Sequence, residues 1–334
     1  MKLVLPLLAA LLARTPVTAG PVPVTATKTD TTVDFKVGDE LVTRYHVGPD
    51  VAKPYFWPLN APGGVPVTRG WPMLKGLPKE TTVHVHQKSG WFCHGDVIPE
   101  GIELKARSAD KNVKGVDFWS EGKGHGVIAC VEVSDPKPSA HDGAVTTRNE
   151  WRAADGTKIL DEGRTISVRN LNDARLIVLD IDLQASVCPI TFGDTKEGSM
   201  GVRVNDEFRL TAPKSNGVVT AADGSTAKAP ARDNLPMWGK HSDWNDYSGP
   251  VDGKLVGIAI FDHPKNNPRA AWHTRAYGLM AANPFGRASF PGAKGELFKL
   301  AKGEHLKLRY GILLHTGDAK EGKVAERFAA FAKE

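Results

Sequence analysis

Short apolar segments separated by turn residues recur through most of the chain, and this spacing constrains the fold more than any other feature. The clearest run extends from residue 126 to residue 183, where successive segments alternate apolar and polar side chains. Asp155-Gly156 and Asn172-Asp173 stand between segments as hairpin turns. Alternation with a period of two is typical of strands that cover a core with one face. We therefore expect an antiparallel meander here.

Turn signals continue on both sides of this meander, and only the tail from Gly322 to Glu334 has helical spacing. There Val324, Phe328 and Phe331 fall on one face. No repeat of fixed period is present, which disfavours a propeller or a solenoid. The sequence predicts an all-β fold, a large antiparallel β-sandwich with one C-terminal helix.

Two finer expectations concern strand placement. The segments at 53–59 and 65–72 are rich in proline, so they are expected at sheet edges or in covering loops. Residues 297–300 and 306–314, with a turn at Gly303, are expected to pair as a hairpin.

The first residues have the pattern of a secretory signal peptide. Lys2 precedes an apolar run from Leu3 to Leu12, and small residues follow at Val17-Thr18-Ala19. We expect cleavage after residue 19, which leaves residues 20–334 as a single β-sandwich domain in the periplasm or outside the cell. No later segment approaches the length of apolar sequence that a transmembrane helix needs.

Charge and cysteine usage exclude several classes of partner. Residues 1–19 contain Lys2 and Arg14 and no acidic residue, so their removal lowers the formal charge from +5 to +3. Lys and Arg are scattered, which argues against nucleic-acid binding. Cys93, Cys130 and Cys188 allow at most one disulfide. Cys93 is a conceivable nucleophile, but a buried free thiol is the preferred interpretation.

The segment between Val256 and Gly286 has the highest concentration of side chains that could take part in catalysis or binding. Val256 to Phe261 is predicted to be one strand and Trp272 to Leu279 a second, joined by a turn that contains Asp262 and His263. His273, Arg275 and Tyr277 then project from one face. If the two strands form a hairpin, these groups lie close together. A polar face turned to solvent is the alternative.

A second group of histidines lies at His84, His86 and His94. His84 and His86 are two apart on a segment predicted to be extended, so both imidazoles share a face. Together with His94 they could transfer protons or bind a divalent metal. The spacing alone is a weak signal for metal, and we predict no cofactor.

Carboxylates stand beside aromatic residues in two further segments, around Trp119 and around Asp246-Tyr247. Such pairs suit carbohydrate, because an aromatic face stacks on a sugar ring while carboxylates accept hydrogen bonds from its hydroxyls. No G-x-S-x-G elbow or phosphate-binding glycine loop is present. What remains is acid–base chemistry by histidine and carboxylate, with arginine to hold negative charge.

Several segments resemble a known family, the secreted bacterial "methane oxygenase PmoA" family. The segments that carry the resemblance are KPYFWPL, GVPVTRGWPM, GWFCHGD, GVDFW, DYSG, FDHP, WHTRAYG and NPFG, between Lys53 and His315. The resemblance implies a supersandwich-like all-β fold, similar to the supersandwich of aldose epimerases, which is an analogy of fold only. The family name is a poor guide to activity, because a membrane monooxygenase subunit needs spanning helices.

One segment departs from the family pattern. His84, His86, Trp91, His94 and Asp96 match its histidine segment. The intervening family residues Asp, Pro, His and Arg are replaced by Val83, Val85, Gln87 and Lys88. A lost histidine could weaken or redirect the activity.

The leading hypothesis is an exported carbohydrate-active enzyme, a glycoside hydrolase or lyase acting on a poly- or oligosaccharide. The alternatives are a non-catalytic glycan-binding or envelope protein and a metal-dependent oxidoreductase. The predicted catalytic residues are His84, His86, His94, His273 and Arg275. The predicted substrate-binding residues are Asp96, Trp119, Asp246, Tyr247, Asp262, His263, Trp272, Tyr277 and Asn283.

Overall fold

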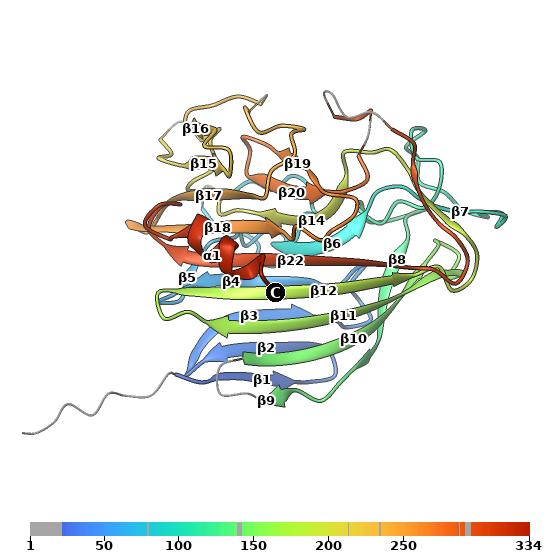
Figure 1. Cartoon of the computed structure of the whole chain (residues 1–334), viewed down its shortest axis with the longest axis horizontal. Helices are drawn as coiled ribbons and strands as arrows, with labels where there is room; N and C mark the ends of the chain where they lie inside the picture. Colours follow the sequence, from blue (N-terminus) through green and yellow to red (C-terminus); the bar gives the residue numbers. More distant parts are fainter. Residues whose placement is uncertain are drawn as a thin grey trace, which may run out of the picture.

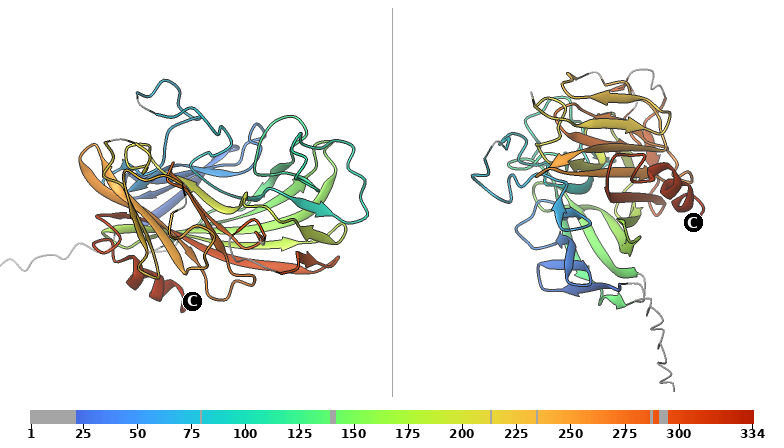
Figure 2. Two further views of the ribbon diagram at one scale, coloured as in Figure 1. Left: turned by 90° about the horizontal axis from the view of Figure 1, so that it is seen from above. Right: turned by 90° about the vertical axis from the view of Figure 1, so that its left-hand side faces the viewer.

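The computed structural model describes residues 22–78, 80–138, 142–212, 214–233, 235–286, 288–290 and 295–334. The signal peptide expected at residues 1–19 lies outside this part of the chain. Within it the strands form two large antiparallel sheets and a small third one, and Figures 1 and 2 show the two large sheets layered against each other. The predicted all-β sandwich is confirmed.

The nine-stranded sheet contains strands from residues 24–94 and from residues 198–283. In spatial order its members are β1 (Val24–Lys28), β2 (Thr32–Val37), β3 (Glu40–His46), β4 (Tyr55–Ala61), β6 (Gly90–His94), β14 (Gly198–Arg203), β20 (Leu279–Asn283) and β19 (Ala271–Thr274), with β5 (Val65–Pro66) beside β4.

The ten-stranded sheet includes the predicted meander. Its order is β16 (Thr226–Lys228), β15 (Val218–Ala221), β17 (Trp244–Val251), β18 (Lys254–Asp262), β22 (His305–Thr316), β12 (Ala174–Gln184), β11 (Lys158–Asn170), β10 (Asp142–Arg152) and β8 (Val127–Val133), with β9 (Lys137–Pro138) beside β10. The small sheet has the order β21 (Phe298–Leu300), β13 (Ile190–Phe192) and β7 (Val97–Pro99).

Side chains between the two large sheets form one continuous core. Phe92 of β6 contacts Trp151 of β10 and Tyr310 of β22, with ring centroids 6.2 Å and 6.1 Å apart. The opposite face of the ten-stranded sheet is covered in part by α1 (Val324–Phe331), as the tail periodicity predicts. Its buried residues pack on an apolar patch that includes Leu176, Phe261 and Leu313.

The expected edge placement is wrong for residues 53–59, and the expected hairpin of residues 297–314 is wrong as well. β4 lies inside its sheet, between β3 and β6, although it contains Pro58. It tolerates the proline because its pairing with β3 shifts register and it pairs with β6 only at Tyr55 and Phe56. β21 pairs with β13 and not with β22, so residues 297–314 are not a hairpin.

A buried ion pair lies in the core beneath the meander. Arg164 donates from Nε to Glu162 Oε1 at 2.6 Å, and both side chains are fully buried. Arg164 also donates to the Tyr45 hydroxyl across the sandwich, while Trp151 Nε1 donates to Glu162. The pair therefore links both sheets.

Replacing Glu162 by alanine is expected to lower the free energy of unfolding by about 3–5 kcal/mol, because the buried Arg164 cation loses its partner. Urea denaturation followed by tryptophan fluorescence measures the change. Glu132→Ala is the matched control, since Glu132 pairs with Arg148 in solvent and its loss should cost under about 1 kcal/mol. Equal costs for the two variants would contradict the role given to the buried pair.

Candidate functional site

A row of aromatic and imidazole rings lies on the face of the nine-stranded sheet that points away from the core. We call it the histidine–aromatic cluster, and its members are Tyr277, His84, His86, Trp119, His273 and Trp238. Each ring contacts the next, with centroids 5.2, 5.9, 6.4, 6.4 and 5.0 Å apart in that order. These residues come from four stretches of sequence, so the fold assembles the cluster.

The cluster has a buried floor and accessible sides. Trp119 and His273 are each 1% exposed, while His84 is exposed and His86, Trp238 and Tyr277 are half-buried. Gly201 makes room for the floor: a Cβ there would lie 3.0 Å from the Trp91 ring and 3.4 Å from Trp119. A ligand would therefore meet the half-buried rings first.

His273 projects outward from β19 while its neighbours point to the core. Trp272 donates its indole N–H to the carbonyl oxygen of Ser242, and the Thr274 hydroxyl accepts from Asn245. His273 Nδ1 lies 2.8 Å from the carbonyl oxygen of Lys196. Because a carbonyl can only accept, Nδ1 carries the proton and Nε2 presents a lone pair. No described residue bonds to Nε2.

Burial keeps the histidines of the cluster neutral. It lowers the pKa of His273 and that of His86 to about 3, and the Lys53 cation adds to the effect on His86. The pKa of His84 is lowered as well, by burial and by the Arg203 and Arg69 guanidinium groups. At neutral pH all three imidazoles are therefore uncharged, and each carries one nitrogen lone pair.

The loop that carries His84 and His86 is a turn and not the extended segment expected. The backbone N–H of Gln87 donates to the His84 carbonyl at 3.0 Å, and His84 has a φ of 54°. Val83 and Val85 are 54% and 48% exposed, so their alternation with histidine does not mark a core-facing strand. The two imidazoles nevertheless remain in contact.

Two buried arginines fix this loop to the sheet. Arg69 donates to the carbonyl oxygens of Thr81 and His84, at 3.3 Å and 2.8 Å. Arg203 donates to Gln87 Oε1 at 2.7 Å, and its guanidinium lies over the Tyr277 ring at 4.7 Å. These bonds hold His84 in a backbone conformation that a histidine rarely adopts.

Polar groups complete the accessible side. Arg275 lies over the Trp238 ring at 4.7 Å and pairs with Asp233 at 2.9 Å. Glu197 Oε2 lies 4.0 Å from His273 Nδ1, and burial raises the pKa of Glu197. Burial also raises the pKa of Tyr277, so its phenol keeps its proton at neutral pH. The cluster thus offers proton acceptors beside proton donors.

The predicted hairpin between residues 256 and 279 is wrong. β18 belongs to the ten-stranded sheet, whereas β19 is the edge strand of the nine-stranded sheet. Asp262 is buried and accepts hydrogen bonds from Arg269, Asn266 and the Ala270 N–H. His263 packs against Phe331 of α1. The structure therefore places both residues away from His273.

Other predicted site residues are held in structural bonds. Asp246 Oδ2 lies 2.7 Å from His315 Nε2 in the interior, and the Tyr247 hydroxyl donates to the Ala276 carbonyl. Asp96 accepts from the Lys114 and Gly115 N–H groups. Asn283 donates to the Thr195 carbonyl and accepts from the Phe285 and Gly286 N–H groups. These residues, and the core-facing Trp272, support the fold around the cluster.

His94 lies on the opposite face of β6 from Trp91, because the two residues are three positions apart and successive strand side chains alternate between faces. Its ring packs on Phe285 and Phe192, and Nε2 donates to the Gly193 carbonyl at 2.8 Å. The predicted trio of His84, His86 and His94 is therefore not brought together. In the ranges that the structure describes, no group of three histidine, cysteine or acidic side chains is placed to hold a metal ion.

Replacing His94 by glutamine is expected to affect stability and not activity. Glutamine can still donate to the Gly193 carbonyl, but loss of the ring packing on Phe285 and Phe192 should lower the free energy of unfolding by about 1–3 kcal/mol. Turnover at 25 °C should stay within about twofold of wild type, because His94 does not reach the cluster. Denaturation and assays on the same preparation check both parts. A large loss of turnover in a folded variant would show that His94 contributes to catalysis.

Sequence reasoning missed Trp238, Glu197, Arg69 and Arg203. Trp238 stands in the segment WGKH, whose aromatic beside charge was the available signal. The arginines gave none, because their partners are backbone carbonyls distant in sequence. Cys93 is buried on β6, and burial raises the pKa of its thiol to about 12, which removes it as a nucleophile.

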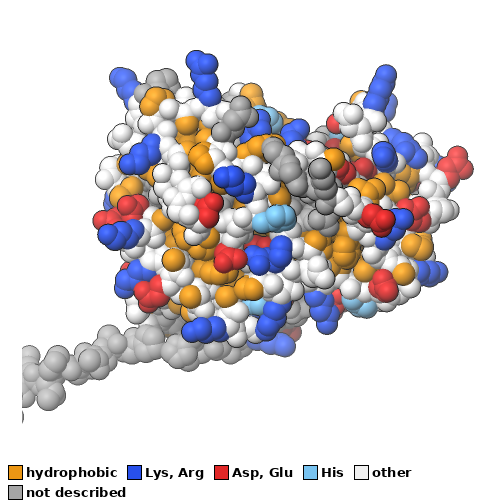
Figure 3. All heavy atoms as spheres, turned by 45° about the horizontal axis from the view of Figure 1, so that its top comes forward, with side chains coloured by type: hydrophobic (Ala, Val, Ile, Leu, Met, Phe, Trp, Pro, Cys, Tyr) orange, Lys and Arg blue, Asp and Glu red, His pale blue; other side chains and the backbone are white. Residues whose placement is uncertain are grey.

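Charge around the molecule is mixed. On the face drawn in Figure 3, Lys and Arg side chains alternate with Asp and Glu and do not form one large field. No helix in the described ranges is both long and apolar enough to cross a membrane.

The fold and the cluster define a large β-sandwich protein with a histidine–aromatic site on one sheet. The chain belongs to a family described as of unknown function (DUF6807), whose model matches residues 32–329. No curated protein matches the sequence.

The solved structures that resemble the chain include three at low identity. A galactose 1-epimerase from Lactobacillus acidophilus NCFM is 8% identical with a TM-score of 0.45, over 89% of this chain and 99% of that one. A galactose mutarotase-like protein from Lactobacillus casei ATCC 334 is 13% identical with a TM-score of 0.39, over 87% and 100%. The α-galactosidase from Lactobacillus brevis is 11% identical with a TM-score of 0.41, over 88% of this chain and 40% of the enzyme, so the chain spans about two fifths of its length. None of these likenesses identifies a substrate or a catalytic residue of this chain.

Proposed function

We propose that this protein is an exported carbohydrate-active enzyme that cleaves a glycosidic linkage by acid–base catalysis, as a hydrolase or a lyase. The observation that carries the proposal is the continuous row of rings that ends in Tyr277 and Trp238 and contains neutral His86 and His273. Aromatic surface binds the apolar face of a sugar ring, and neutral imidazoles accept protons.

The roles follow from accessibility and protonation. The half-buried rings of Trp238 and Tyr277 contact the sugar. His273 accepts a proton at Nε2, while the Lys196 carbonyl holds Nδ1–H in place and the nearby Glu197 carboxyl group stabilises the imidazolium. His86, which has no hydrogen-bond partner among the described residues, is the second proton acceptor. The Tyr277 phenol donates to the leaving oxygen, and Arg275 supports negative charge that develops there.

A second function, glycan binding without turnover, is favoured by one observation. His273 is only 1% exposed, which limits the contact of its Nε2 with a substrate. In that case the same rings would hold a sugar and release it unchanged. Calorimetric binding in the absence of any product distinguishes this function from catalysis.

The direct test is a glycan screen. Purified protein is incubated with plant, algal and bacterial polysaccharides and their oligosaccharides, and the products are separated by chromatography. We expect shortened products from at least one glycan, and mass spectrometry separates the two reaction types, because hydrolysis adds water and elimination does not. A folded protein that neither cleaves nor binds any glycan would overturn the proposal.

A further inference from the structure

A second candidate site lies on the outer face of the ten-stranded sheet, beyond the end of α1. Along β12 the outward residues change character where the helix ends. Leu176 and Val178 pack under α1, whereas Asp180, Asp182 and Gln184 continue the same face without a helix over them. β22 changes in the same way, from Leu313 to Arg309. A polar half of this sheet face is therefore left open.

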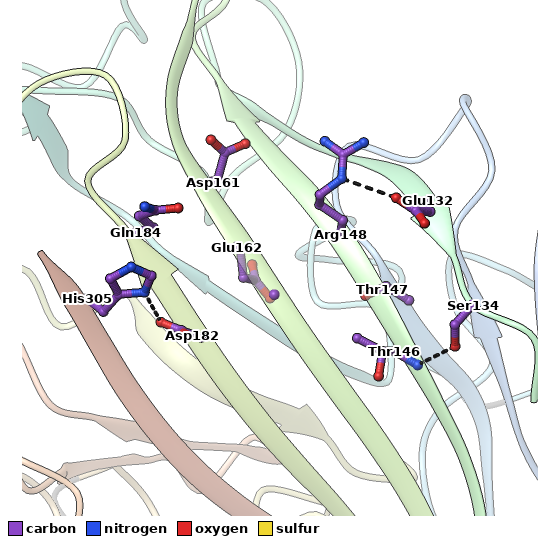
Figure 4. A pocket seen from close by; sticks show the side chains of 11 residues that line it. Glu132, Ser134, Thr146, Thr147, Arg148, Asp161, Glu162, Asp182, Gln184 and His305 are labelled. Carbon is purple, nitrogen blue, oxygen red and sulfur yellow. Dashed lines mark hydrogen bonds and ion pairs between the residues drawn. The ribbon is translucent and has the colours of Figure 1, made fainter. Parts of the chain in front are cut away.

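Two adjoining hollows occupy this open half. Their volumes are about 340 and 510 Å³, and they share Thr146, Gly163 and Asp182. Gly163 accounts for the depth at the centre, since a Cβ on it would meet no atom within 4 Å. Figure 4 shows the first hollow, with side chains from β8, β10, β11, β12 and β22 standing next to one another across the sheet. We call the joined hollows the outer groove.

The charges of the outer groove neutralise one another. Arg148 bonds to Glu132 at 3.3 Å and His305 to Asp182 at 2.8 Å. At the other end, Arg309 pairs with both Asp180 and Glu334, each at 2.6 Å. A polyanion or polycation would therefore meet no field of opposite sign. The groove offers many donors and acceptors and little net charge.

Apolar contact is scarce in the same groove. Its aliphatic lining residues, Ile181 and Leu308, are buried. A docking surface for a folded protein or for lipid needs an exposed apolar centre, which this lining does not supply. A neutral, polyhydroxylated ligand fits better, because hydroxyl groups both donate to carboxylates and accept from guanidinium and amide groups.

One buried donor at the end of the groove has no partner. His263 lines the second hollow and is 2% exposed. Its Nδ1 accepts the Lys265 N–H at 3.2 Å, so in the neutral ring Nε2 carries the hydrogen. Among the described residues nothing accepts from this Nε2. A buried donor left without an acceptor is costly, and a ligand oxygen would satisfy it.

We propose that the outer groove binds a neutral oligosaccharide chain, laid across the strands from β8 to β22. Neighbouring strands are about 4.8 Å apart, so five strands span roughly 19 Å, which accommodates several sugar units. The groove lies on the other large sheet from the histidine–aromatic cluster. It would hold a polymer on the protein without taking part in cleavage.

Gly163 provides a clean test, because its φ is not left-handed and the space above it is open. Gly163→Trp fills the groove, whereas Gly163→Ala leaves most of it free and is the matched control. Affinity electrophoresis through gels that contain galactomannan, xyloglucan or mixed-linkage β-glucan measures binding, with polygalacturonate as the charged counterpart. His273→Gln runs beside them, because a defect in the cluster should not alter binding in the groove.

We expect wild type, Gly163→Ala and His273→Gln to be retarded by at least one neutral polysaccharide. Gly163→Trp should raise the dissociation constant at least about tenfold, which is about 1.4 kcal/mol. Circular dichroism confirms that both glycine variants are folded. The proposal is overturned if no neutral glycan retards the protein, if Gly163→Trp binds as wild type does, or if polygalacturonate binds better. It is also overturned if the groove joins two copies, seen as a dimer that Gly163→Trp dissociates.

Discussion

Replacing His273 by glutamine is expected to lower kcat at least about 100-fold on the oligosaccharide that the glycan screen identifies, because a positioned general base contributes about 10²–10⁴-fold. Glutamine is uncharged and similar in size to histidine, but it offers no nitrogen lone pair of comparable basicity. Binding should change little, since the half-buried Trp238 and Tyr277 still contact the sugar. Steady-state kinetics and calorimetry on the same preparations separate the two effects.

His94→Gln is the matched control for this variant. Both histidines are 1% exposed and both donate to a backbone carbonyl, but they lie on opposite faces of one sheet. Loss of turnover in His273→Gln together with retention in His94→Gln would assign the chemistry to the outward face. Equal turnover in wild type and His273→Gln would remove His273 from the mechanism.

Acid is expected to lower the free energy of unfolding, because several histidines are buried in their neutral form. Burial lowers the pKa of His86 and His273 to about 3 and that of His94 to about 4, against an ordinary value of 6.5. Below pH 6.5 the unfolded chain therefore binds more protons than the folded one. Stability is complete above pH 6.5 and falls as the pH drops toward 4, by up to about 1.4 kcal/mol per pH unit for each histidine.

Buried carboxyl groups oppose this effect. The pKa values of Asp262, Asp96, Glu80 and Glu197 are raised by burial, so these groups take up protons first in the folded state. A substitution isolates the histidine contribution. Urea denaturation of wild type and His273→Gln at pH 7.5, 6 and 5 should show a shallower loss of stability in the variant. Parallel curves, or a wild type equally stable at pH 5 and 7.5, would contradict the assignment of neutral buried histidines.

The strand pattern predicted the fold well because alternation is local information. The hairpins at Asp155-Gly156 and Asn172-Asp173 and the apolar face of α1 follow directly from it. Which sheet a strand joins is not local. β18 and β19 are close in sequence yet lie in different sheets. For this reason Asp262 and His263, which lie at the end of β18 and directly after it, are not part of the cluster.

The candidate site was predicted in part for the same reason. His84, His86, Trp119, His273, Arg275 and Tyr277 were each expected in a site, and the structure brings them together through contacts between distant segments. Their neighbour Trp238 had a signal in the segment WGKH, whereas Glu197 stands in no motif, and the contact of each with His273 joins segments distant in sequence. The prediction for His94 was wrong, because the sequence of β6 does not reveal which of its two faces packs on the core.

The most direct test of the central claim is a crystal structure of His273→Gln with the oligosaccharide that wild type cleaves. The account predicts a sugar unit in contact with Trp238 and Tyr277, with its glycosidic oxygen within hydrogen-bonding distance of the Tyr277 hydroxyl. A sugar bound only elsewhere on the protein, for example in the outer groove, would contradict it.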